Sequence, residues 1–378
     1  MKNDPGTNPL ARFHRLVQDH AEQGIDNRKR MYSIYLKMLP AGLMGRLEDW
    51  RYRRRVRKTR LHEPPLYLLG HWRSGTTFLQ FLLGRDPNLV FHSKFQTFFP
   101  KSFLLTEETV KPIAKTFLNG FSGISAWRNG ISLDMELDTP SEIEVSLMNE
   151  GSPVSFHWGH VFPRSWRYYF DRFLFQDGLT RREIRQWERD VHRLNRKVQL
   201  KHPQSRLMVK NPGDTARVNR ILALYPDARF VFLHRDPYDV FYSNIKLWQN
   251  LLKNLSLQHM PKGELKQAIL YTYRRMHKAY LEQRRLIPLG NLVEISHSEL
   301  SADPVGTARS IYGSLGLDGW PQARVGIEAF AKKRQQTYQR AGYQYHYEDI
   351  EAIEREWGFM FDAFGYPLWQ GERSAFNT

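Results

Sequence analysis

The 378-residue sequence contains no cysteine. A disulfide framework, a thiolate metal site and a cysteine nucleophile are therefore excluded, and the composition fits a cytoplasmic protein. The sequence also lacks an uncharged apolar run of about 18 residues, which a membrane-spanning helix needs, and residues 1–20 lack the apolar core of a secretory signal. We therefore expect a cytoplasmic chain without a signal peptide or transmembrane helix.

Acidic residues are scarce relative to basic ones. The chain has 39 Asp and Glu against 56 Lys and Arg, a formal net charge of +17. This excess predicts an anionic partner, which leaves nucleic acid, a membrane surface and a phosphorylated cofactor open. The densest basic segment is Leu47–Leu61, where aromatic residues interleave with arginines. Such segments are most often solvated helix faces, and the aromatic interleaving would also suit RNA or an anionic lipid surface such as the inner membrane.

A glycine-rich turn stands at the centre of the sequence pattern. Leu66–Leu69 has the length and composition of a buried strand, Gly70–Thr77 follows it, and apolar residues then recur at helical spacing. The spacing of Gly70 and Gly75 is typical of a phosphate-binding loop. Thr76 stands where a Walker A loop has its lysine, so the loop is poorly equipped for a nucleoside triphosphate. The cationic residue lies inside the turn instead, at Arg73.

The order of the expected elements predicts an α/β fold with three layers, P-loop-like, around a central parallel sheet. Strands separated by helices pair in parallel, and ligands bind at their carboxyl ends. We expect residues 1–61 to form a helical, basic N-terminal segment that packs on one domain of residues 62–378, with a helical insertion over about 90–200. Strands are expected at Leu66–Leu69, Leu207–Lys210, Arg229–His234 and Asn291–Ile295.

Two of the expected helix starts carry capping signals. Thr139 and Pro140, with Glu142 three residues after the threonine, have the pattern of a capping box. Asp236 and Pro237, directly after the third expected strand, are placed as N-cap and first helical residue.

Two strand ends together resemble the sulfotransferases that use 3′-phosphoadenosine 5′-phosphosulfate (PAPS), especially bacterial relatives acting on carbohydrates or lipids. Gly70–Thr77 is similar to their 5′-phosphosulfate loop, whose core is Arg/Lys-Ser-Gly-Thr-Thr. Arg229–Ser243 is similar to their 3′-phosphate motif, with Arg235, Asp239 and Ser243 at the matching positions, and Leu207–Asn219 is similar to the segment that precedes it in prokaryotic relatives.

The resemblance implies transfer of a sulfuryl group from PAPS to a hydroxyl or amine acceptor, in line and without a metal. Two separate anions on PAPS need a backbone cradle at one strand end and a basic clamp at the next. The residues that the resemblance assigns to PAPS are Arg73, Ser74, Gly75, Thr76, Thr77, Arg235 and Ser243.

The catalytic candidates lie at the same sheet edge. Arg73 is expected to stabilise the departing bisphosphate, and Lys210 is a second cation at a strand end. The histidine base of the cytosolic members is replaced here by Pro212, so the base must lie elsewhere. Bacterial relatives use a carboxylate, and a Pro-x-Glu-x-Glu-like helix start makes Glu142 the first candidate and Glu144 the second.

Asp214 and His234 remain further candidates for the base. The capping box offers a purely structural role for Glu142, and an ion pair with Asp239 offers one for Arg235. Two other functions stay open: a P-loop kinase or nucleotide hydrolase, and a basic binder of nucleic acid or membrane surface. The first is disfavoured because Thr76 replaces the Walker lysine and no magnesium-holding Asp is evident. The second leaves the loop and the Arg235 and Ser243 pair unexplained, so nucleic acid is not the expected partner.

The acceptor is expected to be a small molecule, a glycan or a lipid-linked molecule. The aromatic residues of the insertion would suit sugar stacking or a lipid chain, although core packing is their commoner use. These residues are Phe98, Phe99, Trp127, Phe156, Trp158 and Trp166.

Overall fold

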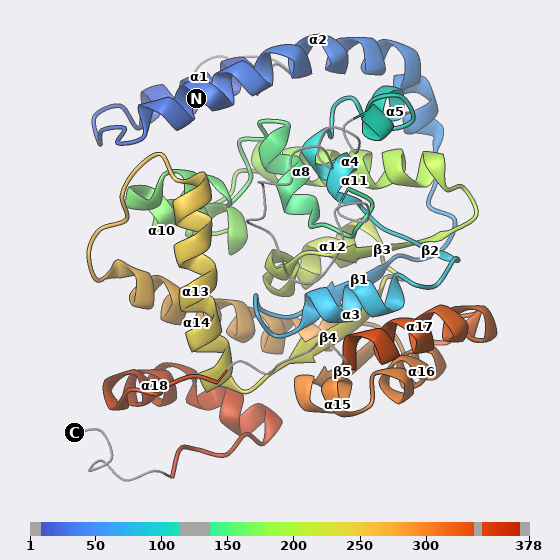
Figure 1. The fold of residues 1–378 in the computed structure, drawn as a ribbon, viewed down its shortest axis with the longest axis vertical. Coiled ribbons are helices and arrows are strands. Elements are labelled where there is room, and N and C mark those ends of the chain that lie inside the picture. Colours follow the sequence, from blue (N-terminus) through green and yellow to red (C-terminus); the bar gives the residue numbers. More distant parts are fainter. Residues whose placement is uncertain (1–8, 114–136, 336–341, 371–378) are drawn as a thin grey trace.

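The computed structural model describes residues 9–113, 137–335 and 342–370, which form a helix–sheet–helix arrangement (Figure 1). The sheet has the strand order β2-β3-β1-β4-β5, and every pairing in it is parallel. The predicted α/β fold with a central parallel sheet is therefore confirmed, although the sequence analysis missed the short strand β2. The strands are β1 (Leu66–Leu69), β2 (Leu89–Val90), β3 (Arg206–Lys210), β4 (Arg229–His234) and β5 (Leu292–Ser296).

The two faces of the sheet are covered by separate hydrophobic clusters. Alternate residues of a strand point to opposite faces, so Tyr67 and Leu69 join one cluster while Leu66 and Leu68 join the other. This double burial explains why the strands read as continuous apolar runs. The first cluster includes residues of α12 (Val218–Leu224), α13 (Pro237–Leu255), α14 (Glu264–Gln283) and α18 (Tyr347–Phe364); the second includes residues of α3 (Thr76–Leu83), α15 (His297–Ala302), α16 (Pro304–Leu315) and α17 (Trp320–Gln335).

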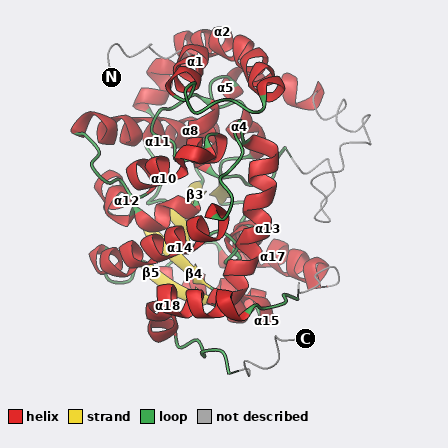
Figure 2. Cartoon of the chain, turned by 90° about the vertical axis from the view of Figure 1, so that its left-hand side faces the viewer, coloured by secondary structure: helices red, strands yellow, loops and turns green. Residues whose placement is uncertain are grey.

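The expected N-terminal helices are present as α1 (Pro9–Asp19) and α2 (Arg28–Lys58). They lie at one end of the molecule and α18 lies at the other (Figure 2). Phe13 and Met38 are buried in the same cluster as the β-strand residues, so both helices pack on the α/β core. The division into a segment 1–61 and a domain 62–378 stays a prediction.

The insertion was expected between β2 and β3, and the described residues there, 91–113 and 137–205, form helices and loops. Phe156, Trp158 and Trp166 are buried in the core, whereas Phe98 and Phe99 are exposed. Trp127 lies outside the described residues. The helices here are α4 (Lys94–Phe98), α5 (Phe103–Thr106), α8 (Ile143–Asn149), α9 (Trp158–Val161), α10 (Trp166–Tyr169), a π-helical turn (Phe170–Leu174) and α11 (Arg181–Lys201), with a 3₁₀ turn at Pro163–Ser165.

Helix α13 begins as the sequence predicts. The Asp236 carboxylate accepts hydrogen bonds from the backbone N–H groups of Tyr238 (2.8 Å) and Asp239 (3.4 Å), and Pro237 is the first helical residue. Helices α15 and α17 were not anticipated. Two further 3₁₀ turns span Pro212–Ala216 and Arg284–Leu286.

None of the helices in the described ranges is long and apolar enough to cross a bilayer.

Candidate active site

The loop after β1 is held in shape by its own polar groups. Gly70 has φ +140°, and a Cβ there would lie 2.5 Å from the Leu233 carbonyl oxygen, so only glycine fits. The Gly70 N–H donates to the buried Thr215 hydroxyl at 2.8 Å, and the Ser74 hydroxyl donates to the His71 carbonyl at 2.7 Å. The Ser74 side chain therefore closes the turn and does not line the cavity described below.

The loop has the backbone of an anion cradle. Arg73 adopts a left-handed conformation with φ +72°, and Gly75 has φ +104°. Gly75 is also the N-cap of α3 and provides no side-chain capping bond, which leaves the positive end of the helix for an anionic ligand. A Cβ at Gly75 would lie 2.6 Å from Cδ2 of His297, so the loop closely approaches the segment after β5. These features fit the 5′-phosphosulfate that the resemblance implies.

A second cationic group lies where β4 ends. Arg235 donates from Nη2 to the Asp239 carboxylate at 2.7 Å and from Nη1 to the Arg73 carbonyl at 3.1 Å. Its Nε is buried and has no hydrogen-bond partner among the described residues. Ser243, one turn beyond Asp239 on α13, accepts a bond from Nε of Arg73 at 2.7 Å. The expected ion pair of Arg235 is present, and the arginine contacts the loop as well.

Lys210 and Glu142 meet at the carboxyl end of β3. The ammonium lies 2.5 Å from the Glu142 carboxylate, and both side chains line the cavity. The capping box predicted at Thr139 is wrong, because α8 begins at Ile143. Glu142 occupies the N-cap position in an extended conformation and makes no side-chain cap bond, so its carboxylate is available to Lys210.

Glu144 is placed differently from Glu142. Its side chain is fully buried, lies 3.2 Å from Nη1 of the equally buried Arg217, and accepts bonds from the Ser155 hydroxyl (2.8 Å) and the Phe156 N–H (3.2 Å). It does not line the cavity. Glu144 therefore has buried polar partners, and of these two carboxylates it is Glu142 that lines the cavity.

The two further candidates for the base also lie away from the cavity. Asp214 is buried, accepts a bond from Asn211 at 2.9 Å, and burial raises its pKa to about 7. His234 is bonded to the Tyr366 hydroxyl at 2.7 Å and stacks on Phe364, and burial lowers its pKa to about 4. Neither is among the residues that line the cavity.

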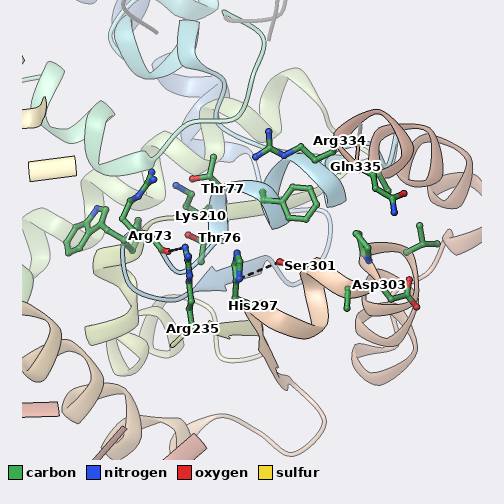
Figure 3. A pocket seen from close by; sticks show the side chains of 18 of the residues that line it. Arg73, Thr76, Thr77, Lys210, Arg235, His297, Ser301, Asp303, Arg334 and Gln335 are labelled. Carbon is green, nitrogen blue, oxygen red and sulfur yellow. Dashed lines mark hydrogen bonds between the residues drawn. The ribbon is translucent and has the colours of Figure 1, made fainter. Parts of the chain in front are cut away.

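The cavity has a volume of about 680 Å³ and lies at the carboxyl ends of β1, β3, β4 and β5 (Figure 3). This is the edge that parallel α/β sheets use for ligands, at the point where the chain crosses from one side of β1 to the other. Among the described residues, no group of three His, Asp or Glu side chains is arranged to hold a metal ion. The residues that match sequence expectations and line the cavity are Arg73, Gly75, Thr76, Thr77, Glu142, Lys210 and Arg235.

Sequence reasoning missed the side of the cavity that α15 and α17 build. His297 directly follows β5, and Lys332 and Arg334 lie in the last turn of α17. The strand-end rule that found Lys210 and Arg235 also applies to His297, whereas α17 carries no motif. Figure 3 shows His297 near Thr76 and Arg334 on the opposite wall.

Residues 64–322 match the Sulfotransferase family, a range that contains the loop, Lys210, Arg235 and Ser243. The chain therefore belongs to this family and is a sulfotransferase. Members of the family typically use PAPS.

Among curated proteins, the chain is similar to the omega-hydroxy-beta-dihydromenaquinone-9 sulfotransferase Stf3 of Mycobacterium bovis and of Mycobacterium tuberculosis. It is 29% identical to each over 317 residues, which cover 83% of this chain and 78% of the relative. These relatives are named for a menaquinone derivative, omega-hydroxy-beta-dihydromenaquinone-9.

Among solved structures, the fold is similar to sulfotransferase STF9 from Mycobacterium avium, with a TM-score of 0.69, 18% identity, and coverage of 97% of this chain and 99% of that one. Sulfotransferase STF1 from Mycobacterium tuberculosis gives a TM-score of 0.68 at 19% identity, covering 94% and 93%. At these identities the likeness establishes the shared fold.

Proposed function

We propose that this sulfotransferase uses PAPS as donor and a hydroxyl group of a lipid or lipid-linked molecule as acceptor. The observation that carries the donor assignment is the junction of the two anion-binding motifs. Arg73 of the loop donates to Ser243, Arg235 donates to the Arg73 carbonyl, and the buried Nε of Arg235 has no protein partner among the described residues. A buried guanidinium N–H without a partner is costly, and a phosphate oxygen would satisfy it.

Each anion of the donor has its own set of residues in this proposal. The 5′-phosphosulfate would bind the backbone of Gly75, Thr76 and Thr77 at the start of α3, with the guanidinium of Arg73 beside it. The 3′-phosphate would bind Arg235 and the hydroxyl of Ser243. A site that selects for both anions distinguishes PAPS from ATP, which has no 3′-phosphate.

PAPS supplies an activated sulfuryl group. The protein side chains must stabilise the charge on the leaving bisphosphate and accept the proton of the acceptor hydroxyl. Sulfuryl transfer breaks the bond between sulfur and the phosphate oxygen and forms one between sulfur and the acceptor oxygen, so negative charge grows on the leaving bisphosphate. Arg73 and Lys210 are the cations placed to offset that charge. The Glu142 carboxylate takes the proton of the acceptor hydroxyl.

Lys210 has a second task as a positioning residue for Glu142. At 2.5 Å the ammonium fixes the carboxylate at the cavity wall, and it also sets the charge balance of a site that is otherwise strongly cationic. Because the pair is largely shielded from solvent, the orientation of Glu142 depends on it.

The lipid side of the proposal rests on the similarity to the menaquinone sulfotransferases and on the apolar residues at the cavity. Trp72, Phe78 and Leu247 line it beside the charged groups. A prenyl chain or another apolar chain could bind along such a wall. A glycan or an amine acceptor remains an alternative within the same reaction.

Calorimetric titration with adenosine 3′,5′-bisphosphate, the product of the donor, tests the donor site. The parent protein should bind it, and Arg235→Ala should weaken binding by roughly 10- to 100-fold, the value of one or two charge-assisted hydrogen bonds. Arg229→Ala, at the other end of the same strand, serves as control because Arg229 donates to the Gly316 carbonyl away from the site. Absence of binding to the parent would refute the donor assignment, and equal binding by Arg235→Ala would refute the clamp.

Transfer of radiolabelled sulfate from PAPS tests the acceptor. Purified enzyme would be offered a hydroxylated prenyl quinol, a glycolipid and a free oligosaccharide in parallel. Labelling of a lipid-linked hydroxyl and not of the free oligosaccharide is the expected result. Labelling of the free oligosaccharide alone would reject the lipid class while leaving the donor assignment untouched.

A further inference from the structure

The outer face of α2 is unusual for a surface helix because large apolar side chains run along it. Trp50 is 85% exposed, Leu36 69%, Tyr32 and Leu43 64% each, and Leu47 47%. We call these five residues the apolar stripe. At about 100° per residue, they fall within about 60° of one another around the helix, over roughly 27 Å of its length. They therefore share one side of the helix and are not scattered exposures.

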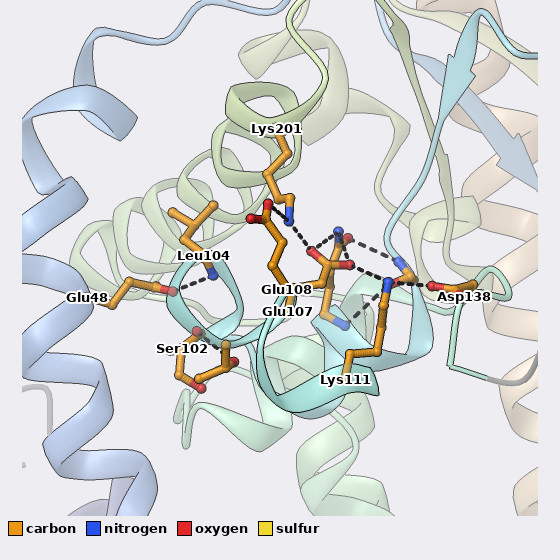
Figure 4. Close-up of polar contacts among 11 residues, drawn as sticks. Glu48, Ser102, Leu104, Glu107, Glu108, Lys111, Asp138 and Lys201 are labelled. Atoms are coloured by element: carbon orange, nitrogen blue, oxygen red, sulfur yellow. Dashed lines mark hydrogen bonds and ion pairs between the residues drawn. The ribbon is translucent and has the colours of Figure 1, made fainter. Parts of the chain in front are cut away.

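The opposite face of α2 is fixed to the core, which directs the apolar stripe outward. Met38 and Val56 are buried on that inner face. Glu48 accepts a bond from the Leu104 N–H at 2.7 Å (Figure 4). It also forms a buried ion pair with Lys197. The helix therefore cannot turn its apolar stripe inward without breaking this buried pair.

Basic side chains border the apolar stripe along its C-terminal half. Asp49 is the one exposed acidic residue in the range 46–60, all of which the structure describes. We call the exposed basic residues beside the stripe the basic border; they are Arg46, Arg51, Arg53, Arg54, Arg57 and Lys58.

We propose that the apolar stripe and basic border of α2 form a surface that docks on an anionic lipid bilayer. The combination is that of an interfacial helix, whose apolar face enters the boundary between headgroups and acyl chains while basic residues contact anionic lipids. RNA would use the basic border but would leave a tryptophan, three leucines and a tyrosine in water. A lipid surface uses both features, and this decides between the two partners.

The docking goes beyond sulfuryl transfer, although it suits the proposed lipid acceptor. An enzyme held at the bilayer surface is exposed to a lipid-linked hydroxyl at a higher local concentration than an enzyme free in solution. Docking needs neither PAPS nor acceptor. Vesicle binding therefore tests the docking surface, and titration with adenosine 3′,5′-bisphosphate tests the donor site independently.

Flotation of the full chain with vesicles tests the proposal. The probes are vesicles of phosphatidylglycerol and phosphatidylcholine in equal parts, vesicles of phosphatidylcholine alone, and single-stranded polyuridylate. We expect binding to the anionic vesicles, weak binding to the neutral ones, and a fall in vesicle binding as the salt concentration rises.

Two variants separate the two features of the surface. The stripe variant Leu43→Gln, Leu47→Gln, Trp50→Gln keeps every charge, and the border variant Arg51→Gln, Arg54→Gln, Arg57→Gln keeps every apolar group. Each should reduce binding to anionic vesicles by at least about 10-fold. Since all six side chains are exposed, circular dichroism and the melting temperature should stay close to those of the parent.

Matched controls place the same changes elsewhere on the surface. Leu289→Gln, Val325→Gln, Leu368→Gln removes three other exposed apolar groups, and Arg181→Gln, Arg185→Gln, Arg285→Gln removes three other exposed charges. Both should bind anionic vesicles like the parent.

Three outcomes would overturn the proposal. The stripe variant could bind anionic vesicles as tightly as the parent. The parent could bind polyuridylate but no vesicle, which would assign the surface to nucleic acid. The parent could form a dimer by light scattering that the stripe variant abolishes, with no vesicle binding, which would assign the surface to a second copy of the chain.

Discussion

Nε of Arg73 lies 2.7 Å from the hydroxyl of Ser243, to which it donates a hydrogen bond. The first residue belongs to the loop after β1 and the second to α13, so the bond joins the two motifs that the sequence shows far apart. A ligand that engages both motifs meets groups already held relative to one another, which reduces the entropy lost on binding.

Replacement of Ser243 by alanine should therefore weaken the binding of adenosine 3′,5′-bisphosphate by about 10-fold, because one hydrogen bond and the constraint on Arg73 are lost. Ser314→Ala, an exposed serine of α16, is the control. A double-mutant cycle with Arg73→Lys in calorimetry measures the coupling directly. Strictly additive effects would show that the bond between the two motifs plays no part in binding.

Glu142→Gln should lower kcat for sulfuryl transfer by at least about 100-fold, because the amide cannot accept the acceptor proton. Affinity for adenosine 3′,5′-bisphosphate should change little, since this ligand lacks the sulfuryl group. Glu328→Gln, which changes another carboxylate lining the cavity, should retain activity. A Glu142→Gln enzyme with parental kcat would leave the reaction without its proposed base.

Glu144→Gln should act on stability instead. It removes the charge of the nearer of the two carboxylates beside the fully buried Arg217, the other being Asp214 at 3.7 Å, and should lower the free energy of unfolding by about 3–5 kcal/mol, measured by urea denaturation. Glu328 pairs with Arg324 in an exposed position, and Glu328→Gln should cost less than about 1 kcal/mol. An equally stable Glu144→Gln protein that had lost activity would instead place Glu144 in the chemistry.

Gly75→Ala should weaken the binding of adenosine 3′,5′-bisphosphate by about 10-fold or more. A residue other than glycine is strained at φ +104°, and its Cβ would lie 2.6 Å from the His297 ring. Adding His297→Ala removes the contact but not the backbone strain, so it should restore affinity only in part. Gly313→Ala, at a helical position with open space, should be neutral or slightly stabilising. Parental affinity in Gly75→Ala would contradict the cradle geometry.

His92 predicts an acid limit to stability. It is fully buried with Nε2 2.8 Å from the Asn195 amide oxygen, and burial lowers its pKa from 6.5 to about 4. The unfolded chain therefore binds a proton that the folded chain does not between these pH values, and the free energy of unfolding falls as pH drops from 6.5 towards 4.

His92→Gln should reduce the loss of unfolding free energy between pH 6.5 and 4 by about 3 kcal/mol, measured by urea denaturation at several pH values. The exposed His62→Gln is the control and should leave the slope unchanged. If the free energy of unfolding fell equally with pH in His92→Gln and in the parent, other groups would control the acid transition.

Much of the proposed donor side could be predicted from sequence because it depends on local signals. A strand, a glycine turn and a helix follow one another around Gly70 and Gly75, and Asp236 caps its helix from adjacent residues. The strand-end rule then brings Lys210 and Arg235 to the same edge without knowledge of the packing.

The acceptor side depends on contacts that no local pattern contains. The pattern around Thr139 fits a helix start, yet the chain stays extended up to Glu142. Pro140 forms an antiparallel bridge with Ser93, and the Ser141 N–H donates to the His92 carbonyl at 2.8 Å. Glu142 and Glu144 lie two residues apart, yet one faces the cavity and the other is buried against Arg217. Burial of that kind is a tertiary property.

The central position of β1 has a consequence for how the protein is made. Leu66 is paired with Met208 of β3 on one side and with Arg229 of β4 on the other. Strand β1 is therefore synthesised long before either of the strands with which it pairs. Contacts of such large sequence separation slow folding, and an emerging chain that stops before β4 exposes an apolar strand edge. We expect the nascent chain to depend on chaperones until β4 has left the ribosome, and the cavity at the strand ends to be among the last parts to form.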